Sequence, residues 1–101
     1  MNVATMAMRF RVEQERITSI VQEAAQKLEK TDVDLVLDFS SVSRLDTSAV
    51  EALEELAQLA ENRGAEIVLR EVNIDVYKVL KLIGLTTKFE FPAKTTDGTE
   101  S

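Results

Sequence analysis

The sequence has 101 residues, 45% hydrophobic and 30% charged, with 18 acidic side chains against 12 basic ones. This length and composition are typical of one globular domain with a single core. The formal net charge of -6 argues against general nucleic-acid binding, which requires a basic surface. Cysteine and histidine are both absent, so disulfides, thiol or histidine metal sites and Ser-His-Asp catalysis are excluded. A metal or acid/base site built from carboxylates alone stays open, but no other feature of the sequence supports one. We expect no metal, no cofactor and no enzymatic activity.

The beginning of the chain lacks the basic and then apolar pattern of a signal peptide. No stretch approaches the roughly 18 consecutive apolar residues that span a membrane. We expect a cytoplasmic protein that does not insert into the membrane.

The first predicted element is a strand over residues 3–12, where apolar and polar side chains alternate. Period-2 alternation with arginines on one face indicates a half-buried strand near a sheet edge. Met6, Met8 and Phe10 are expected in the core, with a dimer or partner contact as the alternative.

Residues 13–30 change to the helical period and predict an amphipathic helix. Its apolar stripe consists of Ile17, Ile20, Val21, Ala24 and Leu28. Residues 33–39 follow as a short and nearly continuous apolar run, which is typical of a strand covered on both faces.

A second helix is predicted over residues 48–63 and ends at Gly64, which supplies a left-handed C-terminal position. Residues 65–72 predict another buried strand. Asn73 can cap a third helix that Gly84 closes, and residues 85–91 end as an alternating final strand.

Helices that alternate with short apolar strands imply crossover connections and a largely parallel sheet. We predict an α/β fold with about four strands in a mostly parallel sheet and about three helices. Residues 1–92 form the predicted domain, and residues 93–101 are expected to be a flexible polar tail.

A polar cluster, Asp46-Thr47-Ser48, lies between a buried strand and the second helix. Ser48 and Glu51 fit a capping box, in which each side chain bonds the backbone near the other. Asp46 can cap in a similar way. Capping explains most of this cluster and leaves Thr47 without a structural role.

Phosphorylation of Thr47 would add about two negative charges at a helix N-terminus, where the helix dipole accepts them. A docked partner would then face a dianion beside Asp46 and Glu51, so binding would change while the fold survives. Thr47 is the predicted phosphorylation site, and Ser48 is the second choice.

The second helix carries an acidic face that continues from this cluster. It consists of Glu51, Glu54, Glu55 and Glu61. Such a face is either simply solvated or docks a partner that presents Lys or Arg. Asp38 ends the preceding strand; it either bonds loop N–H groups or supports the hydroxyl of Thr47, and both interpretations stay open.

The run from residue 36 to residue 91 resembles the STAS domain family. The family pattern is an apolar strand ending in Asp or Asn, a short loop, and then an apolar residue, Asp and a hydroxyl pair that opens a helix. The matching residues are Val36-Leu37-Asp38-Phe39, Val42, Leu45 and Asp46-Thr47-Ser48. Later matches are Gly64-Ala65-Glu66-Ile67-Val68-Leu69 and Val79-Leu80-Lys81-Leu82-Ile83-Gly84-Leu85.

The resemblance to bacterial anti-sigma factor antagonists implies a regulatory binding module for transcription. In such members a partner serine/threonine kinase, which is also the anti-sigma factor, phosphorylates the hydroxyl after the Asp and thereby abolishes the complex. Carried over by position, that hydroxyl is Thr47, with Ser48 next to it. Together with the acidic face argued above, the predicted partner-binding residues are Asp46, Thr47, Ser48, Glu51, Glu54 and Glu55, with Asp38 supporting.

The same resemblance implies an alternative. Other STAS relatives are subunits of phospholipid-transport ABC systems, in which this position contacts the ATPase subunit, or members of sensory complexes. Such a subunit would act by constitutive protein contact. A homodimer is also left open.

Overall fold

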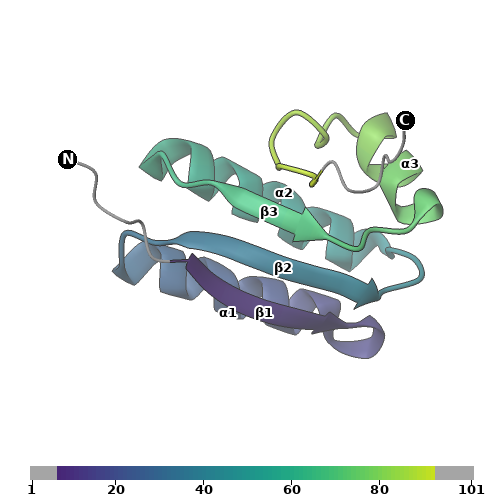
Figure 1. Cartoon of the computed structure of the whole chain (residues 1–101), viewed down its shortest axis with the longest axis horizontal. Coiled ribbons are helices and arrows are strands. Elements are labelled where there is room, and N and C mark those ends of the chain that lie inside the picture. Colours follow the sequence, from purple (N-terminus) through teal and green to yellow (C-terminus); the bar gives the residue numbers. More distant parts are fainter. Residues whose placement is uncertain (1–6, 93–101) are drawn as a thin grey trace.

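The computed structural model describes residues 7–92, and its elements alternate along the chain (Figure 1). Strand β1 (Ala7–Glu13) leads through a short 3₁₀ turn, η1 (Gln14–Arg16), into helix α1 (Ile17–Lys30). Strand β2 (Asp34–Ser41) and helix α2 (Thr47–Arg63) follow, and then strand β3 (Ile67–Arg70) and helix α3 (Ile74–Leu82). The predicted α/β fold with three helices is confirmed.

The three strands form one parallel sheet in the order β1-β2-β3. Met8 pairs with Leu35 and Phe10 with Leu37, and on the other side of β2 Leu37 pairs with Leu69. Crossovers between parallel strands are almost always right-handed, so a sheet built in sequential order receives its helices on one face. Figure 1 shows α1 and α2 side by side behind the strands, with α3 at the carboxyl end beyond β3.

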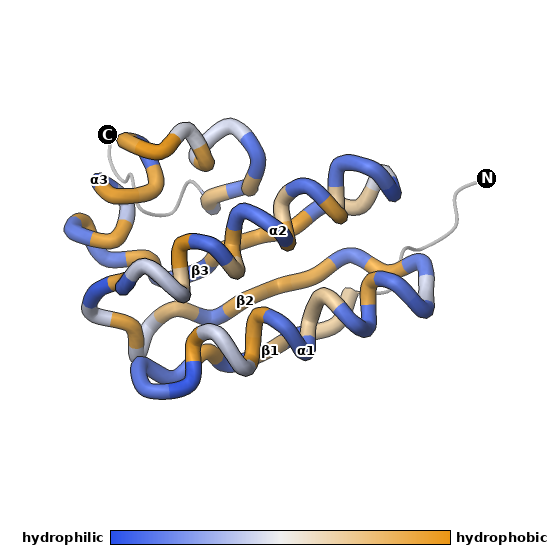
Figure 2. The backbone as a smooth tube through the Cα atoms, turned by 180° about the vertical axis from the view of Figure 1, so that it is seen from behind, coloured by the Kyte–Doolittle hydropathy of each residue, from blue (hydrophilic) through white to orange (hydrophobic). Residues whose placement is uncertain are grey.

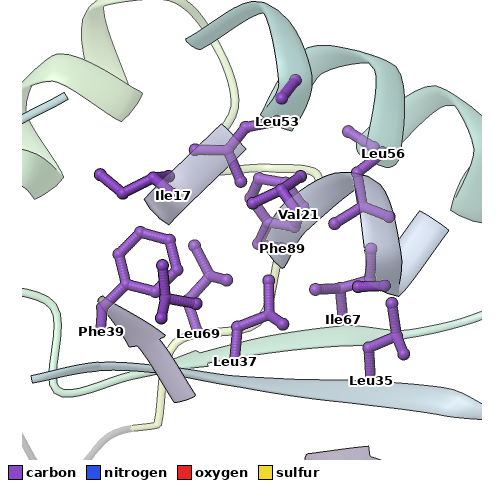
Figure 3. Packing of buried hydrophobic residues seen from close by; sticks show 14 of the residues in the cluster. Ile17, Val21, Leu35, Leu37, Phe39, Leu53, Leu56, Ile67, Leu69 and Phe89 are labelled. Atoms are coloured by element: carbon purple, nitrogen blue, oxygen red, sulfur yellow. The ribbon is translucent and has the colours of Figure 1, made fainter. Parts of the chain in front are cut away.

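The core lies between the sheet and the two long helices. Every residue of the apolar stripe predicted for α1 is buried, and α1 and α2 alternate hydrophobic and hydrophilic segments along their length (Figure 2). The sheet contributes alternate side chains, of which Leu35, Leu37 and Phe39 of β2 are fully buried and point toward the helices (Figure 3). Helix α2 buries Ala49, Ala52, Leu53, Leu56, Ala57 and Ala60 against the sheet and α1, whereas Val50 is only half-buried.

The prediction that β2 is covered on both faces is wrong. Val36 and Asp38, which alternate with the buried leucines, are only half-buried, and no described helix lies over their face of the sheet (Figure 1). The reason is topological, because sequential crossovers of one hand place α1 and α2 on the same side. The apolar run of β2 therefore reflects its central place in the sheet and does not report two covered faces.

The predicted fourth strand is also wrong for the described residues. After α3 the chain turns through Gly84, whose φ is 80°, and only Glu90 reaches the sheet, as an isolated parallel bridge to Val68. Its N–H donates to the carbonyl of Ile67 at 2.8 Å, and its carbonyl accepts from the N–H of Leu69 at 2.9 Å. Pro92, which follows closely, has no N–H with which to extend the ladder.

Residues 3–6 of the first predicted strand lie outside the described residues. From Ala7 onward the strand is confirmed, and its inward residues Met8 and Phe10 are partly buried against the core. Met6 and the predicted polar tail, residues 93–101, lie outside the described residues. Helix α1 begins at Ile17 and not at residue 13 as predicted, because Glu13 ends β1 and Gln14–Arg16 form η1. Two other predicted helix ends are confirmed: Gly64 has φ 68° at the C-cap of α2, and the side chain of Asn73 accepts from the N–H of Val76 at the N-cap of α3.

Candidate functional site

The polar cluster lies at the carboxyl edge of the sheet. In a parallel sheet all strands end at the same edge, so the connections from β1 to α1, from β2 to α2 and from β3 to α3 meet there. The three arrowheads in Figure 1 point to this edge. The loop from β2 to α2, residues 42–46, is the middle connection and carries the candidate site.

Two side chains from the neighbouring connections hold this loop. Gln14 Oε1 accepts hydrogen bonds from the N–H groups of Ser43 (2.6 Å) and Arg44 (3.1 Å), and Gln14 Nε2 donates to the carbonyl of Arg44 (3.0 Å). Asn73 Nδ2 donates to the carbonyls of Val42 (3.0 Å) and Ser43 (3.3 Å). Neither contact was predicted, because Gln14 belongs to no motif that marks a loop contact and Asn73 was predicted only as a helix cap.

The cap of α2 is Asp46 and not Ser48. Helix α2 begins at Thr47, and Asp46 Oδ1 accepts from the N–H of Ala49 at 2.9 Å. A capping box needs Glu or Gln three residues after the cap. With Asp46 as the cap that position holds Ala49, so the predicted reciprocal bond between Ser48 and Glu51 does not form.

Thr47 and Ser48 occupy the first two positions of α2, and both are exposed. Within residues 7–92 neither hydroxyl makes a hydrogen bond to another side chain or to the backbone. With Asp46 as the cap, both hydroxyls are available for contact or modification.

Asp46→Ala is expected to lower the free energy of unfolding by about 1 kcal/mol, because the N–H of Ala49 loses its acceptor and the helix dipole loses a favourable charge. Ser48→Ala should change it by less than about 0.5 kcal/mol, because Ser48 has no capping bond to lose. Urea unfolding of the two variants measures the difference. A larger loss for Ser48→Ala would show that Ser48 is the cap after all.

The acidic face of α2 is solvent-exposed. Glu51, Glu54 and Glu55 are exposed on the first half of the helix, whereas Glu61, near its end, pairs with Lys88 at 3.1 Å. No group of three acidic side chains among the described residues is placed to hold a metal ion. The part of this face next to Thr47 is therefore available to a partner, and Glu61 already has an intramolecular one.

Asp38 lies on the uncovered face of the sheet, between Arg11 of β1 and Arg70 of β3. Its Oδ1 accepts from the N–H of Ser40 at 2.9 Å. The prediction that Asp38 ends the strand is wrong, because β2 continues to Ser41 and the bond to Ser40 lies within the strand. The alternation of β2 places the carboxylate on the opposite face of the sheet from α2, and so away from Thr47. Hydrogen bonds from the backbone and side chain of Ser40, together with the charges of Arg11 and Arg70, lower the pKa of Asp38 below 3.8.

A carboxyl whose folded pKa is depressed stabilises the folded state above its unfolded pKa, and this contribution is lost as the pH falls through the folded value. Wild type should therefore be more stable than Asp38→Asn at about pH 7, and the difference should shrink below the ordinary value of 3.8. Urea unfolding of the wild type and of Asp38→Asn, from about pH 7 down to below 3.8, measures this difference in stability. A gap that does not change with pH would show that the charge of Asp38 is not responsible.

The arrangement offers exposed hydroxyl and carboxylate groups for contact. Parallel α/β sheets bind small ligands in the crevice where the strand order reverses, and the order β1-β2-β3 has no such reversal among the described strands. In residues 7–92 no helix is both long and apolar enough to cross a membrane. The fold and the site together define a small parallel α/β domain with an exposed polar site at the carboxyl edge of its sheet.

A family model of the STAS domain matches residues 12–99, and the chain belongs to this family. The resemblance predicted from the sequence is confirmed. The comparison with curated proteins found no match.

Solved structures with the same fold include a variant of RsbS from Moorella thermoacetica, with a TM-score of 0.71 and 19% identity over 90% of this chain and 84% of that one. A candidate anti-sigma factor antagonist from Thermotoga maritima has a TM-score of 0.65 and 17% identity over 88% and 74% of the two chains. A chain of the stressosome, described as a signal integration and transduction hub, has a TM-score of 0.67 and 20% identity over 89% and 84%. At these identities the likeness establishes the fold.

Proposed function

We propose that this protein is a non-enzymatic regulatory module that binds another protein in the manner of an anti-sigma factor antagonist, and that phosphorylation of Thr47 switches the binding. The observation that carries the proposal is the exposed hydroxyl of Thr47, which directly follows the capping Asp46 and has no hydrogen-bond partner among residues 7–92. Membership of the STAS family and the likeness in fold to a candidate anti-sigma factor antagonist support it.

The partner is a serine/threonine kinase or an anti-sigma factor with a basic surface. It contacts the start of α2, including Ser48 and the exposed carboxylates of Glu51, Glu54 and Glu55. In the modifying step Thr47 Oγ1 attacks the γ-phosphorus of ATP held by the kinase, ADP leaves, and the hydroxyl proton passes to a base of the kinase. The product carries about two negative charges and three acceptor oxygens at the first helical residue.

The phosphate would change the contact surface more than the fold. The positive end of the α2 dipole tolerates negative charge, so the helix remains. The surface facing the partner gains a dianion directly beside Asp46 and close to Glu51. A partner whose surface fits the unmodified hydroxyl then loses shape and hydrogen-bond complementarity, since it must accommodate a larger and fully charged group.

A second candidate is a subunit of a sensory complex that acts by constitutive contact, without phosphorylation. The likeness in fold to a chain of the stressosome supports this alternative. Such a subunit would use the same exposed surface at the start of α2. Its contact would require only the unmodified hydroxyl of Thr47 and the exposed carboxylates.

The deciding experiment is to incubate the purified protein and ATP with each serine/threonine kinase of its own genome and to map phosphate by mass spectrometry. Thr47→Val, which removes the hydroxyl at nearly constant shape, is the matched control. The switch requires phosphate on Thr47 in wild type and its loss in Thr47→Val. Absence of phosphate with every kinase would overturn the switch and leave the constitutive subunit. Phosphate on Ser48 alone would move the switch by one residue and contradict the assignment to Thr47.

A further inference from the structure

We infer that Gln14 and Asn73 are positioning residues, which hold the loop from β2 to α2 and thereby fix where Thr47 is presented. Neither residue belongs to the polar cluster, and they lie 29 to 31 residues away from the loop groups that they bind. Each comes from a different neighbouring connection, so the loop is held on both sides. That Gln14 and Asn73 hold the loop does not depend on the proposed function. That they fix the presentation of Thr47 to a kinase rests on the proposed function.

Gln14 satisfies three backbone groups of the loop. Its Oε1 accepts from the N–H groups of Ser43 and Arg44, and its Nε2 donates to the carbonyl of Arg44. A carboxamide suits these three groups because its oxygen accepts and its nitrogen donates, whereas an ionised carboxylate only accepts and the thioether of methionine is at most a weak acceptor. The side chain lies in η1, directly after the edge strand β1, so it links the first crossover of the fold to the second.

Asn73 holds the loop from the side of β3. Its Oδ1 accepts from the N–H of Val76 and caps α3, while its Nδ2 donates to the carbonyls of Val42 and Ser43. One amide therefore closes the start of α3 and also fixes the loop. The buried side chain of Val42 anchors the same segment in the core.

These contacts determine how the start of α2 is presented. Five side-chain hydrogen bonds restrain residues 42–44, and the half-buried Leu45 and the cap Asp46 follow directly. Exposed loops without such restraints are the mobile parts of most domains. A contact hydroxyl must be held closely in place to be recognised, and it is held best when a supporting shell locks the chain around it.

The test uses variants that remove the tethers and leave the helix cap in place. Gln14→Met keeps the size of the side chain and loses all three bonds. Asn73→Asp keeps the acceptor that caps α3 and loses the two donated bonds. Asn73→Ser is a second variant, because it also caps the helix but is too short to reach the loop, and it adds no charge. Gln22→Met, at an exposed position of α1, is the matched control.

Amide hydrogen exchange of the isolated domain, followed residue by residue by NMR, measures the outcome without any partner. Exchange at Ser43 and Arg44 should rise by about five- to tenfold or more in Gln14→Met, which removes the acceptor of both N–H groups. It should rise by a smaller factor in the Asn73 variants, which release the carbonyls of Val42 and Ser43 and loosen the loop indirectly. The exchange rate of the Ala49 amide should rise to a smaller extent, whereas the rates of Val21 in α1 and Leu69 in β3 should stay unchanged. Unchanged exchange in the loop would overturn the inference, and so would an equal rise at every amide, which indicates general destabilisation.

The functional arm rests on the proposed function. With the kinase that modifies Thr47, Gln14→Met should lower kcat/KM by about fivefold or more, and Gln14→Glu should restore part of it, because a carboxylate still accepts from Ser43 and Arg44. Gln22→Met should react as wild type does. A loosened loop with an unchanged kcat/KM would overturn the positioning role. If no kinase modifies the protein, the proposed switch fails and the exchange measurement alone decides whether Gln14 and Asn73 hold the loop.

Discussion

Thr47→Glu is expected to weaken binding to the kinase that modifies Thr47 by at least about tenfold, which corresponds to about 1.4 kcal/mol. A glutamate at the first position of α2 carries one permanent negative charge next to Asp46, and a surface fitted to the uncharged hydroxyl must accommodate both the charge and the longer side chain. The free energy of unfolding should change by less than about 1 kcal/mol, because Thr47 is exposed and the helix dipole favours the charge.

Titration calorimetry of the purified domain with that kinase measures the affinity, and urea unfolding measures the stability. Thr47→Ser keeps the hydroxyl and should bind as wild type does. Gln26→Glu adds the same charge at an exposed position of α1, and it should leave the affinity within about threefold if the effect of Thr47→Glu is local. Unfolding of Thr47→Glu would instead show that Thr47 is structural, and an unchanged affinity would contradict the switch.

Leu37→Ala is expected to lower the free energy of unfolding by about 2 to 5 kcal/mol, while Val36→Ala, one residue earlier in β2, should cost about 1 kcal/mol or less. Leu37 is fully buried on the sheet face that packs against the helices (Figure 3). Its truncation removes apolar contacts and leaves a cavity. Val36 is half-buried on the face that no described helix covers, so its truncation exposes little new apolar surface.

The comparison also tests the arrangement of the layers. Two adjacent aliphatic residues of one strand share their backbone environment and differ mainly in the face on which they lie. Urea unfolding of both variants gives the two losses directly. Equal and large losses would mean that a second layer covers Val36 in solution, for example a partner or another copy of the chain. A small loss for Leu37→Ala would contradict the described core.

The periodicity of the chain was sufficient to predict the helices and most of their buried faces. In α1 the pattern of Ile17, Ile20, Val21, Ala24 and Leu28 predicted the buried stripe completely, because a helix that packs on a single surface must concentrate its apolar residues on one side. The end of α2 at Gly64 and the cap of α3 at Asn73 were also predicted, since both depend on local backbone chemistry that a short stretch of sequence specifies.

The N-cap of α2 was harder to predict than the ends of the other helices, because two residues close together can serve as the cap. Asp46 and Ser48 both suit an N-cap, and the capping-box pattern favoured Ser48. The structure favours Asp46, and the loop ahead of it is held by Gln14 and Asn73. These tethers come from segments about 30 residues away on either side, so no local window of the sequence contains them.

The sequence by itself determined the family, the alternation of strands and helices, and the polar cluster that contains Thr47, because these depend on local spacing and residue type. Only the tertiary structure decided that both long helices cover one face, that Asp38 lies on the other face away from Thr47, and that the last strand shrinks to a bridge at Glu90. It also decided that two distant amides hold the loop before Thr47. All of these features depend on the order in which the strands pair and on the edge of the sheet at which their connections meet. The pattern of apolar residues along the chain specifies neither the order nor the edge.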